Sequence, residues 1–271
     1  MQPKLGIIAG GGKLPLSLAR YCQDTDRDYC VVALRGHADE KYLSQLPNVD
    51  WVRIGAAGQI IQTFKDQKVE DLVMVGPVDR PPIIAAVPDL RGLKFLMRAG
   101  RRAFGGDDSL LSAIANELER EGFRIVGIDD LLGDLVTPAG PLTARKPDEA
   151  AEKAIHLGLE AARKLGNEDI GQAVVVQATD VLALEDSEGT NELIKRAGAL
   201  SDGGGDLILV KAKKPDQDRR VDLPAMGLDT VRLAAEQGFT GIAIEAGHSL
   251  FVDRNQAIEE AERANLFVVG V

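Results

Sequence analysis

The segment from Lys211 to Pro224 contains five cations and three carboxylates and directly follows an apolar run. Lys and Arg side chains can hold phosphate oxygens while a carboxylate binds a divalent ion or activates water, the division of labour used in phosphoryl and pyrophosphoryl transfer. A solvated hairpin would carry the same charges without any chemistry. Under the first interpretation, the expected phosphate partners are Lys211, Lys213, Arg219 and Arg220.

Asp222 differs from the other acidic residues of this segment in its neighbours. It lies between Val221 and the pair Leu223–Pro224, an apolar setting that predicts partial burial. Because a half-buried carboxylate needs a cation or metal nearby, Asp222 is the candidate catalytic residue, as a metal ligand or as the group that positions water. On a predicted strand-to-helix turn, Thr190 is a candidate substrate contact and Glu185 a candidate metal ligand.

Glycines near the N-terminus predict a second binding element. Gly10, Gly11, Gly12 and Lys13 lie between an apolar run and a helical pattern, where backbone N–H groups and a helix N-terminus can face a phosphate or nucleotide. However, Pro15 stands where a dinucleotide-binding fingerprint has its third glycine, and no Ser or Thr follows Lys13 as in a Walker motif. A tight turn without a ligand is therefore an equal alternative.

Histidines and cysteines give weaker signals. His37, His156 and His248 are isolated and lack the i,i+4 spacing of a helical metal site. His248 follows a predicted strand and is the best placed of the three for catalysis. The two cysteines, Cys22 and Cys30, have no metal-ligand spacing, so we expect free buried thiols.

The elements that must position these residues follow an α/β pattern, because short apolar runs alternate with longer amphipathic ones. The expected strands are 5–9, 29–34, 51–54, 71–76, 123–126, 173–177, 181–184, 206–210 and 241–244. The expected helices are 14–22, 60–65, 90–101, 110–121, 188–199, 228–237 and a long helix that Asp148 caps and Gly166 ends. A last helix and strand complete the chain.

Residues 134–147 are rich in Pro, Gly and Thr and have little periodicity, which predicts a linker. The fold class is therefore α/β with two domains. We expect an N-terminal Rossmann-like parallel-sheet domain over 1–133 and a C-terminal α/β catalytic domain over 148–271. Because the glycine loop and the charged segment belong to different domains and both suit phosphate, we expect the active site where the domains meet.

Composition limits the partners. A net charge of −10 and a pI near 4.9 disfavour nucleic acid and anionic lipid for the molecule as a whole, so an anionic ligand must meet local basic groups. No secretory leader and no run near ~20 apolar residues is recognisable. These features predict a cytoplasmic protein with at most peripheral contact with a membrane, and they are compatible with a homo-oligomer.

Several motifs together resemble the LpxI-type UDP-2,3-diacylglucosamine pyrophosphatases. The longest is Leu209 to Gly227, with the Val-Asp-Leu-Pro motif at Asp222. The others, in matching order over nearly the whole chain, are Gly6–Pro15, Gly106–Leu111, Asp169–Gln172, Glu185–Thr190 and Gly241–Gly247. Pro77, Asp79 and Asn191 depart from the residues that relatives often have there, so the resemblance assigns these positions no role.

The resemblance implies Mg²⁺-dependent hydrolysis of the pyrophosphate in UDP-2,3-diacylglucosamine, with other divalent ions as substitutes. Water would attack the α-phosphorus and give 2,3-diacylglucosamine 1-phosphate and UMP, a step in lipid A biosynthesis. The essential aspartate of the family corresponds to Asp222, and its glycine-rich loop to Gly10–Lys13.

Acyl chains need apolar space, for which the best stretch is Pro81–Pro88 with Leu93, Phe95, Leu96 and Met97, although ordinary core is an alternative. Two other functional classes stay open. One is a nicotinamide-dependent oxidoreductase, favoured by the strand–glycine loop–helix start and by Arg35 after the second strand. The other is a non-enzymatic nucleotide- or lipid-binding protein.

Overall fold

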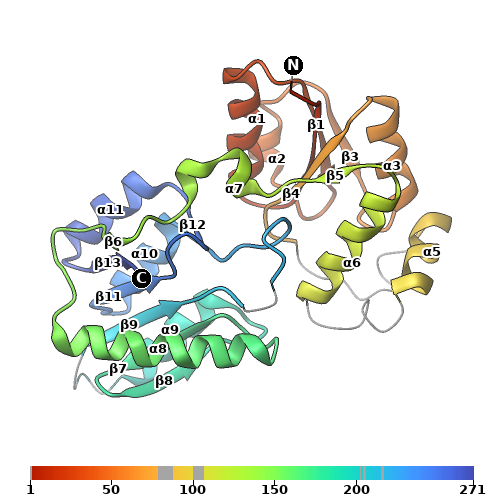
Figure 1. Cartoon of the computed structure of the whole chain (residues 1–271). Coiled ribbons are helices and arrows are strands. Elements are labelled where there is room, and N and C mark those ends of the chain that lie inside the picture. Colours follow the sequence, from red (N-terminus) through yellow and green to blue (C-terminus); the bar gives the residue numbers. More distant parts are fainter. Residues whose placement is uncertain (1, 79–87, 100–106, 202, 204–205, 215–216) are drawn as a thin grey trace. The chain divides into compact units, whose positions relative to one another are not determined.

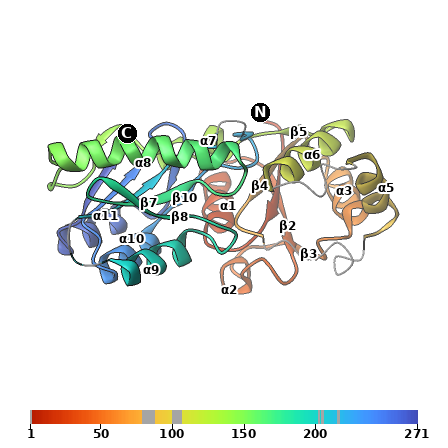
Figure 2. The same cartoon turned by 90° about the horizontal axis from the view of Figure 1, so that it is seen from below.

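The computed structural model describes residues 2–78, 88–99, 107–201, 203, 206–214 and 217–271. The chain forms two compact units. The first comprises Met1–Gly133 with Arg220–Asp222, and the second comprises Asp134–Arg219 with Leu223–Val271. Each unit contains one main sheet with helices on both of its faces (Figures 1 and 2).

A five-stranded parallel sheet forms the centre of the first unit. Its order is β3-β2-β1-β4-β5, which places β1 in the middle. The strands are β1 (Leu5–Ala9), β2 (Tyr29–Leu34), β3 (Val49–Val52), β4 (Asp71–Val75) and β5 (Arg124–Ile125), and every neighbouring pair is parallel. The chain moves outward from β1 to β3 on one side and then returns to β4 on the other. The carboxyl ends of β1 and β4 are therefore a topological switch point, where open α/β sheets bind ligands.

Helices cover both faces of this sheet because the buried strand residues alternate between them. The helices are α1 (Leu14–Asp24), α2 (Glu40–Leu43), α3 (Ala57–Asp66), α5 (Leu90–Ala99), α6 (Asp107–Arg120) and α7 (Ile128–Leu131). Val32 and Leu34 of β2 join a core with residues of α3 and α6, including Ile61, Phe64 and Leu118. Helix α1 contacts β1 and β2 on the opposite side (Figure 1).

A buried ion cluster fixes the amino end of this sheet. Asp71 begins β4 and is 2% exposed. Its carboxylate accepts hydrogen bonds from Arg27 at 2.6 Å and from two nitrogens of Arg124 at 2.7 Å. Because both guanidinium groups pair with this one carboxylate at the strand ends opposite the switch point, the cluster has a structural role.

The second unit is built on a six-stranded mixed sheet of order β6-β13-β11-β9-β7-β8. Its central strands β9, β11 and β13 are parallel, whereas β6, β7 and β8 pair antiparallel with their neighbours. The strands are β6 (Gly140–Pro141), β7 (Ala173–Gln177), β8 (Asp180–Leu184), β9 (Leu207–Lys211), β11 (Gly241–Ile244) and β13 (Phe267–Gly270), and β10 (Ala225–Met226) with β12 (Leu250–Phe251) forms a separate parallel pair.

Helix α8 (Glu149–Asn167) covers one face of this sheet, while α9 (Thr190–Leu200), α10 (Leu228–Glu236) and α11 (Arg254–Arg263) cover the other (Figure 2). Ile155 and Leu159 of α8 pack on Val210 of β9. Because successive residues of a strand face opposite sides, Leu209 belongs to the core on the side of α9–α11.

The predicted fold class, two α/β parts with a parallel N-terminal sheet, is confirmed. The strands predicted at 5–9, 29–34, 173–177 and 241–244 have the expected bounds. The segment predicted as a linker contains a 3₁₀ turn, η2 (Gly133–Leu135), and the edge strand β6. Asp148 caps α8 as predicted, since its carboxylate accepts a hydrogen bond from the Ala151 N–H at 2.8 Å.

The predicted end of α8 at Gly166 is wrong. The helix continues to Asn167, and the left-handed residue beyond it is Asp169, with φ of 54°. Gly166 serves close packing instead, because a Cβ there would lie 3.1 Å from the Cα of Lys214. The expected start of a helix at Glu188 is likewise two residues early, since α9 begins at Thr190.

Candidate functional site

Asp222 has the partial burial that its neighbours predict. Leu223 is 9% exposed and Pro224 is buried, whereas Asp222 itself is half-buried. Val221 packs against the core of the first unit, beside residues such as Val32 and Phe64. The packing of Val221 therefore anchors the chain next to the half-buried Asp222.

Arg220 has a definite partner within the first unit. Its guanidinium group lies 2.6 Å from the carboxylate of Glu119 in α6, and both side chains are roughly a third exposed. Arg219, one residue earlier, is exposed and donates to the carbonyl of Gly247 at 3.4 Å. Of these two neighbouring arginines, the more exposed Arg219 is the better placed to meet a ligand.

Three predicted site residues come together in the second unit as a buried chain of hydrogen bonds. Lys211, the last residue of β9, is 6% exposed, and its Nζ donates to the Thr190 hydroxyl at 3.0 Å and to the Ala225 carbonyl at 3.1 Å. The Thr190 hydroxyl donates in turn to Glu185 at 2.5 Å. Lys211 therefore ties β9 to the start of α9 and to β10.

Glu185 completes this network. It is 6% exposed, and its second carboxylate oxygen accepts hydrogen bonds from the backbone N–H groups of Gln172 at 2.7 Å and Ala173 at 3.1 Å. Three protein donors thus converge on this one carboxylate. The arrangement connects β8 to β7 and explains why a carboxylate is stable in a buried position there.

Lys213 and Lys214 follow β9 at the carboxyl edge of the same sheet. The N–H of Lys213 donates to the carboxylate of Glu245 at 2.8 Å, and Glu245 also pairs with Arg163 of α8 at 2.9 Å. Lys214 pairs with Asp169 at 2.8 Å. Sequence analysis did not single out Arg163, because nothing in the helical pattern of α8 distinguishes it from the other exposed cations.

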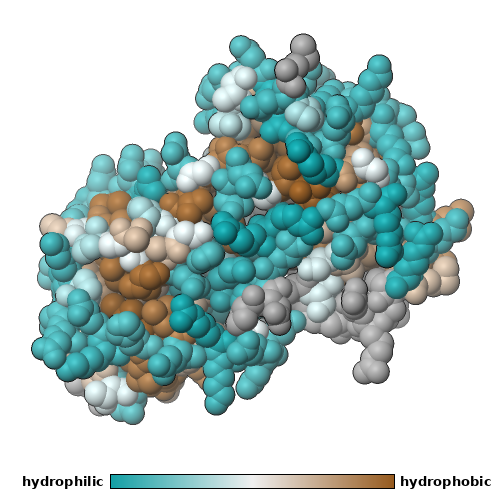
Figure 3. Space-filling model, in the orientation of Figure 1, coloured by the Kyte–Doolittle hydropathy of each residue, from teal (hydrophilic) through white to brown (hydrophobic). Residues whose placement is uncertain are grey.

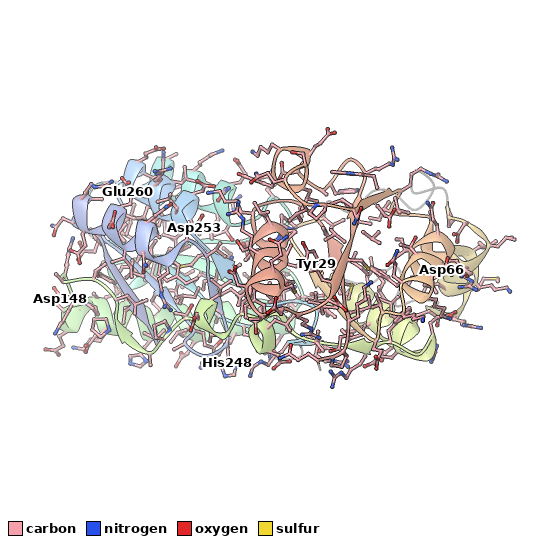
Figure 4. The ribbon with its side chains drawn as sticks, turned by 90° about the horizontal axis from the view of Figure 1, so that it is seen from above. Tyr29, Asp66, Asp148, His248, Asp253 and Glu260 are labelled. Atoms are coloured by element: carbon pink, nitrogen blue, oxygen red, sulfur yellow. The ribbon has the colours of Figure 1, made fainter. Side chains whose placement is uncertain are left out.

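His248 lies in the loop after β11, in the second unit (Figure 4). Its Nδ1 atom is buried and has no hydrogen-bond partner in the described part of the chain. The next residue, Ser249, is 1% exposed and donates through its hydroxyl to the Glu245 carbonyl at 2.6 Å. The loop that carries His248 is therefore held against the end of β11.

The glycine-rich loop lies at the switch point of the first sheet, as its position between β1 and α1 predicts. Its backbone N–H groups already have acceptors: Gly10 donates to the Val75 carbonyl and Gly11 to the Pro77 carbonyl, both at 2.8 Å. The Gly12 N–H donates to the carboxylate of Asp39 at 2.6 Å. A protein carboxylate thus occupies the position at which a phosphate oxygen was expected.

Close backbone packing explains the glycines of this loop. A Cβ at Gly10 would lie 2.5 Å from the Gly76 carbonyl oxygen, and a Cβ at Gly76 would lie 2.3 Å from the Gly11 carbonyl oxygen. Gly12 has a φ of 77°, in the left-handed region that glycine tolerates best. The sequence pattern did not reveal Asp39, because 27 residues separate it from Gly12.

Both thiols are free and buried, as predicted. Burial raises the pKa of Cys22 to about 11, against a smaller opposing effect of Arg27. Burial likewise raises the pKa of Cys30 to about 11, with Lys4 opposing it. Neither thiol is therefore activated for nucleophilic chemistry.

Other predicted features are placed as follows. No group of three or more His, Cys, Asp or Glu side chains suited to a metal ion occurs among the described residues. Asp79 and residues 81–87 of the expected acyl-binding stretch lie outside the described residues. No helix in the described ranges has the length and apolar character needed to cross a membrane.

Comparison with known proteins identifies the family. The LpxI N-terminal domain matches residues 4–135 and the LpxI C-terminal domain matches residues 138–269. A curated relative, the UDP-2,3-diacylglucosamine pyrophosphatase LpxI of Caulobacter vibrioides, is 40% identical over 274 residues, covering 99% of this chain and 97% of the relative.

Among solved structures, the biotin carboxylase subunit of pyruvate carboxylase matches 77% of this chain and 44% of its own, with 13% identity and a TM-score of 0.28. So distant a likeness carries no argument about function. The two domain matches and the full-length relative agree over both units, and the chain belongs to the LpxI family.

Proposed function

We propose that this protein hydrolyses the pyrophosphate bond of UDP-2,3-diacylglucosamine, as a hydrolase of lipid A biosynthesis in the cytosol. The observation that carries the proposal is the 40% identity over 99% of the chain to the relative named for that substrate. Among the three functional classes that the sequence leaves open, this match favours the hydrolase.

The reaction that we propose is the attack of water on the α-phosphorus. A new P–O bond forms there, the bond from the α-phosphorus to the bridging oxygen breaks, and the products are UMP and 2,3-diacylglucosamine 1-phosphate. The half-buried Asp222 is the group that positions the attacking water or a metal ion. Its apolar neighbours limit the freedom of the carboxylate, which is what a positioned catalytic group requires.

Lys213 and Arg219 would hold the diphosphate, because both follow β9 and both side chains reach solvent. Lys211 has a different role in this proposal. Its buried ammonium group holds Thr190 and the carbonyl of Ala225, so it fixes the two ends of the loop that presents the other cations.

In this proposal Asp222 would supply a carboxylate oxygen to Mg²⁺. Mg²⁺ is commonly bound through one or two carboxylates together with substrate phosphate oxygens. When bound, the ion would neutralise charge that develops on the diphosphate oxygens. The three hydrogen bonds that Glu185 accepts favour a structural role for that carboxylate.

The test is incubation with UDP-2,3-diacylglucosamine in ¹⁸O-labelled water, with Mg²⁺ or with a chelator, followed by mass analysis of both products. We expect turnover only with the divalent ion and one ¹⁸O atom in UMP. Label in the lipid phosphate would move the attack to the β-phosphorus, and no cleavage by a folded protein would contradict the proposed function.

A further inference from the structure

Helix α5 (Leu90–Ala99) exposes a row of large apolar side chains. Leu90 is 81% exposed, Leu93 48% and Met97 68%. At about 100° per residue, positions i, i+3 and i+7 fall within roughly 60° of one helix face. In the space-filling view, apolar surface lies over this helix (Figure 3).

The clustering separates α5 from the other exposed apolar residues. Eight large hydrophobic side chains are exposed among the described residues, and three of them belong to this ten-residue helix. Others, such as Ile170, Leu184 and Leu200, lie on separate elements. Single exposed apolar residues are ordinary on soluble proteins, whereas a contiguous row is typical of an interaction surface.

The opposite face of α5 is firmly attached to its unit, so the row does not result from a frayed helix. The Asp89 carboxylate accepts hydrogen bonds at 2.7 Å from the N–H of Gly92 in α5 and from the N–H of Gly58 in α3. Gly92 is buried, and a Cβ there would lie 3.1 Å from the Gly55 carbonyl oxygen. Because of this close approach, Gly92 faces the interior of the first unit. The residues about half a turn away, which include the apolar row, therefore face outward.

Cations flank the apolar row. Arg91, Lys94 and Arg98 are exposed, and the ten residues of α5 contain no acidic side chain, although the chain carries a net charge of −10. Arg98 lies 2.5 Å from Glu117 and Arg91 lies 3.9 Å from Glu121, with the two arginine side chains 57% and 44% exposed. Because both arginine side chains stay partly exposed and a guanidinium group has five N–H donors, each can donate to a phosphate oxygen while it keeps its glutamate.

We propose that the face of α5 formed by Leu90, Leu93 and Met97, with its flanking cations, docks the protein on an anionic lipid surface. A helix that lies in a membrane interface inserts its apolar face while basic residues beside that face contact lipid phosphates. The positive charge of this helix complements anionic lipid, whereas it would repel the same helix of a second copy. The choice of lipid also rests on the proposed function, because that substrate carries two acyl chains and partitions into a membrane.

The experiment is co-flotation of the full chain with vesicles, either of phosphatidylcholine alone or with a third of phosphatidylglycerol. The variant replaces Leu90, Leu93 and Met97 by Ser. We expect the native protein to float with the anionic vesicles at least tenfold more than with neutral ones, and the triple variant to lose most of this binding. A matched control replaces Ile170, Leu184 and Leu200 by Ser and should bind like the native protein. Thermal melting checks that both triple variants are folded.

Hydrolysis of detergent-dispersed UDP-2,3-diacylglucosamine separates this proposal from the proposed function. If the protein binds vesicles but does not hydrolyse the substrate, the docking surface is supported and the proposed hydrolase is contradicted. If it hydrolyses the substrate but does not bind vesicles, only the docking surface is contradicted. With dispersed substrate, KM should agree within twofold between the native protein and the α5 triple variant. A large rise in KM there would assign the face to the acyl chains of a single substrate and overturn membrane docking. If the native protein is a dimer that does not bind vesicles, and the α5 triple variant is a monomer, the apolar face of α5 is instead the contact with a second copy.

Discussion

The carboxyl edges of the two sheets present opposite chemistry. At the edge of the first sheet, the N–H groups of Gly10, Gly11 and Gly12 all donate to protein acceptors, the last of them to the carboxylate of Asp39. At the edge of the second sheet, β9 leads directly into Lys213 and Lys214. One edge thus uses its backbone donors internally, while at the other Lys213 is half-buried and Lys214 pairs with Asp169.

This difference shows that close backbone packing alone can account for a glycine-rich loop. Glycine allows backbones to approach closely, and here the close approach is between Gly10 and Gly76 rather than between the loop and a ligand. A phosphate at this loop would have to displace Asp39 and overcome its negative charge. The close packing and internal hydrogen bonds give the glycine loop a structural role, and diphosphate binding by the segment after β9 stays a prediction.

The largest expected effect concerns Asp222, the residue of the charged segment that belongs to the first unit. Asp222→Ala should reduce kcat by ~10²–10⁴ while substrate affinity largely survives, because a positioned catalytic group acts mainly as the new P–O bond forms. Asp222→Asn should be nearly as inactive if the charge is what matters. Turnover and equilibrium binding would be measured for both variants. Asp66→Ala, at an exposed position of α3, is the matched control and should behave like the native protein.

A folded Asp222→Ala protein that keeps more than about a tenth of the native kcat, well above the expected loss, would remove Asp222 from the chemistry. Attention would then move to Glu245, which pairs with Arg163 and accepts a hydrogen bond from the Lys213 N–H.

The next effect is on stability and tests whether Glu185 is structural. Glu185→Ala would leave the N–H groups of Gln172 and Ala173 and the Thr190 hydroxyl without their acceptor. Because an unsatisfied buried donor costs about 1–3 kcal/mol, we expect the free energy of unfolding to fall by about 3 kcal/mol. Urea denaturation measures this loss, with the exposed Glu160→Ala of α8 as the control. An unchanged midpoint, together with a higher Mg²⁺ concentration needed for half-maximal turnover, would restore Glu185 as a metal ligand.

The fold was largely predictable because its signals are local. The buried strands at 29–34 and 173–177 have apolar runs that end at polar or turn residues, and the structure has the same bounds. The partial burial of Asp222 was also predictable, since Val221 and Leu223 adjoin it in sequence. Gly166 was misassigned because glycine serves both helix termination and close packing, and only the approach of Lys214 separates the two.

Contacts between distant residues could not be predicted in this way. Lys211 lies in the same charged segment as Lys213, yet it ends a strand whose side chains are all buried, so it bonds to Thr190 and Ala225 instead of reaching solvent. Asp39 and Gly12 are brought together only by the pairing of β1 with β2. The charge pattern predicts the segment, but the three-dimensional fold decides which of its cations are accessible.

A smaller effect would test the first edge directly. Asp39→Ala removes the acceptor of the Gly12 N–H, so we expect a loss of about 1–2 kcal/mol in the free energy of unfolding and a KM within twofold of the native value. Thermal melting and steady-state kinetics measure the two quantities. A fall in KM, with the freed N–H and the lost negative charge favouring the diphosphate, would return the glycine loop to the substrate site.

The smallest expected effect concerns the thiols, the only cysteines of the chain, both in the first unit. With pKa values raised to about 11 by burial, the thiolate fraction at pH 8 is on the order of 10⁻³. N-ethylmaleimide at pH 8 should therefore leave both turnover and protein mass unchanged over an hour.

The buried thiols also predict how the stability of the protein changes with pH. Because the folded pKa of each thiol lies above the 9.0 of an ordinary thiol, the stability that the protonated thiols contribute is complete below pH 9 and declines as the pH rises toward 11. Urea midpoints of the native protein and of Cys22→Ala between pH 8 and pH 10.5 would show a shallower decline in the variant. Rapid labelling at pH 8 with loss of turnover would show that the first unit contains a reactive group. It would contradict the view that the first unit contributes structure rather than chemistry.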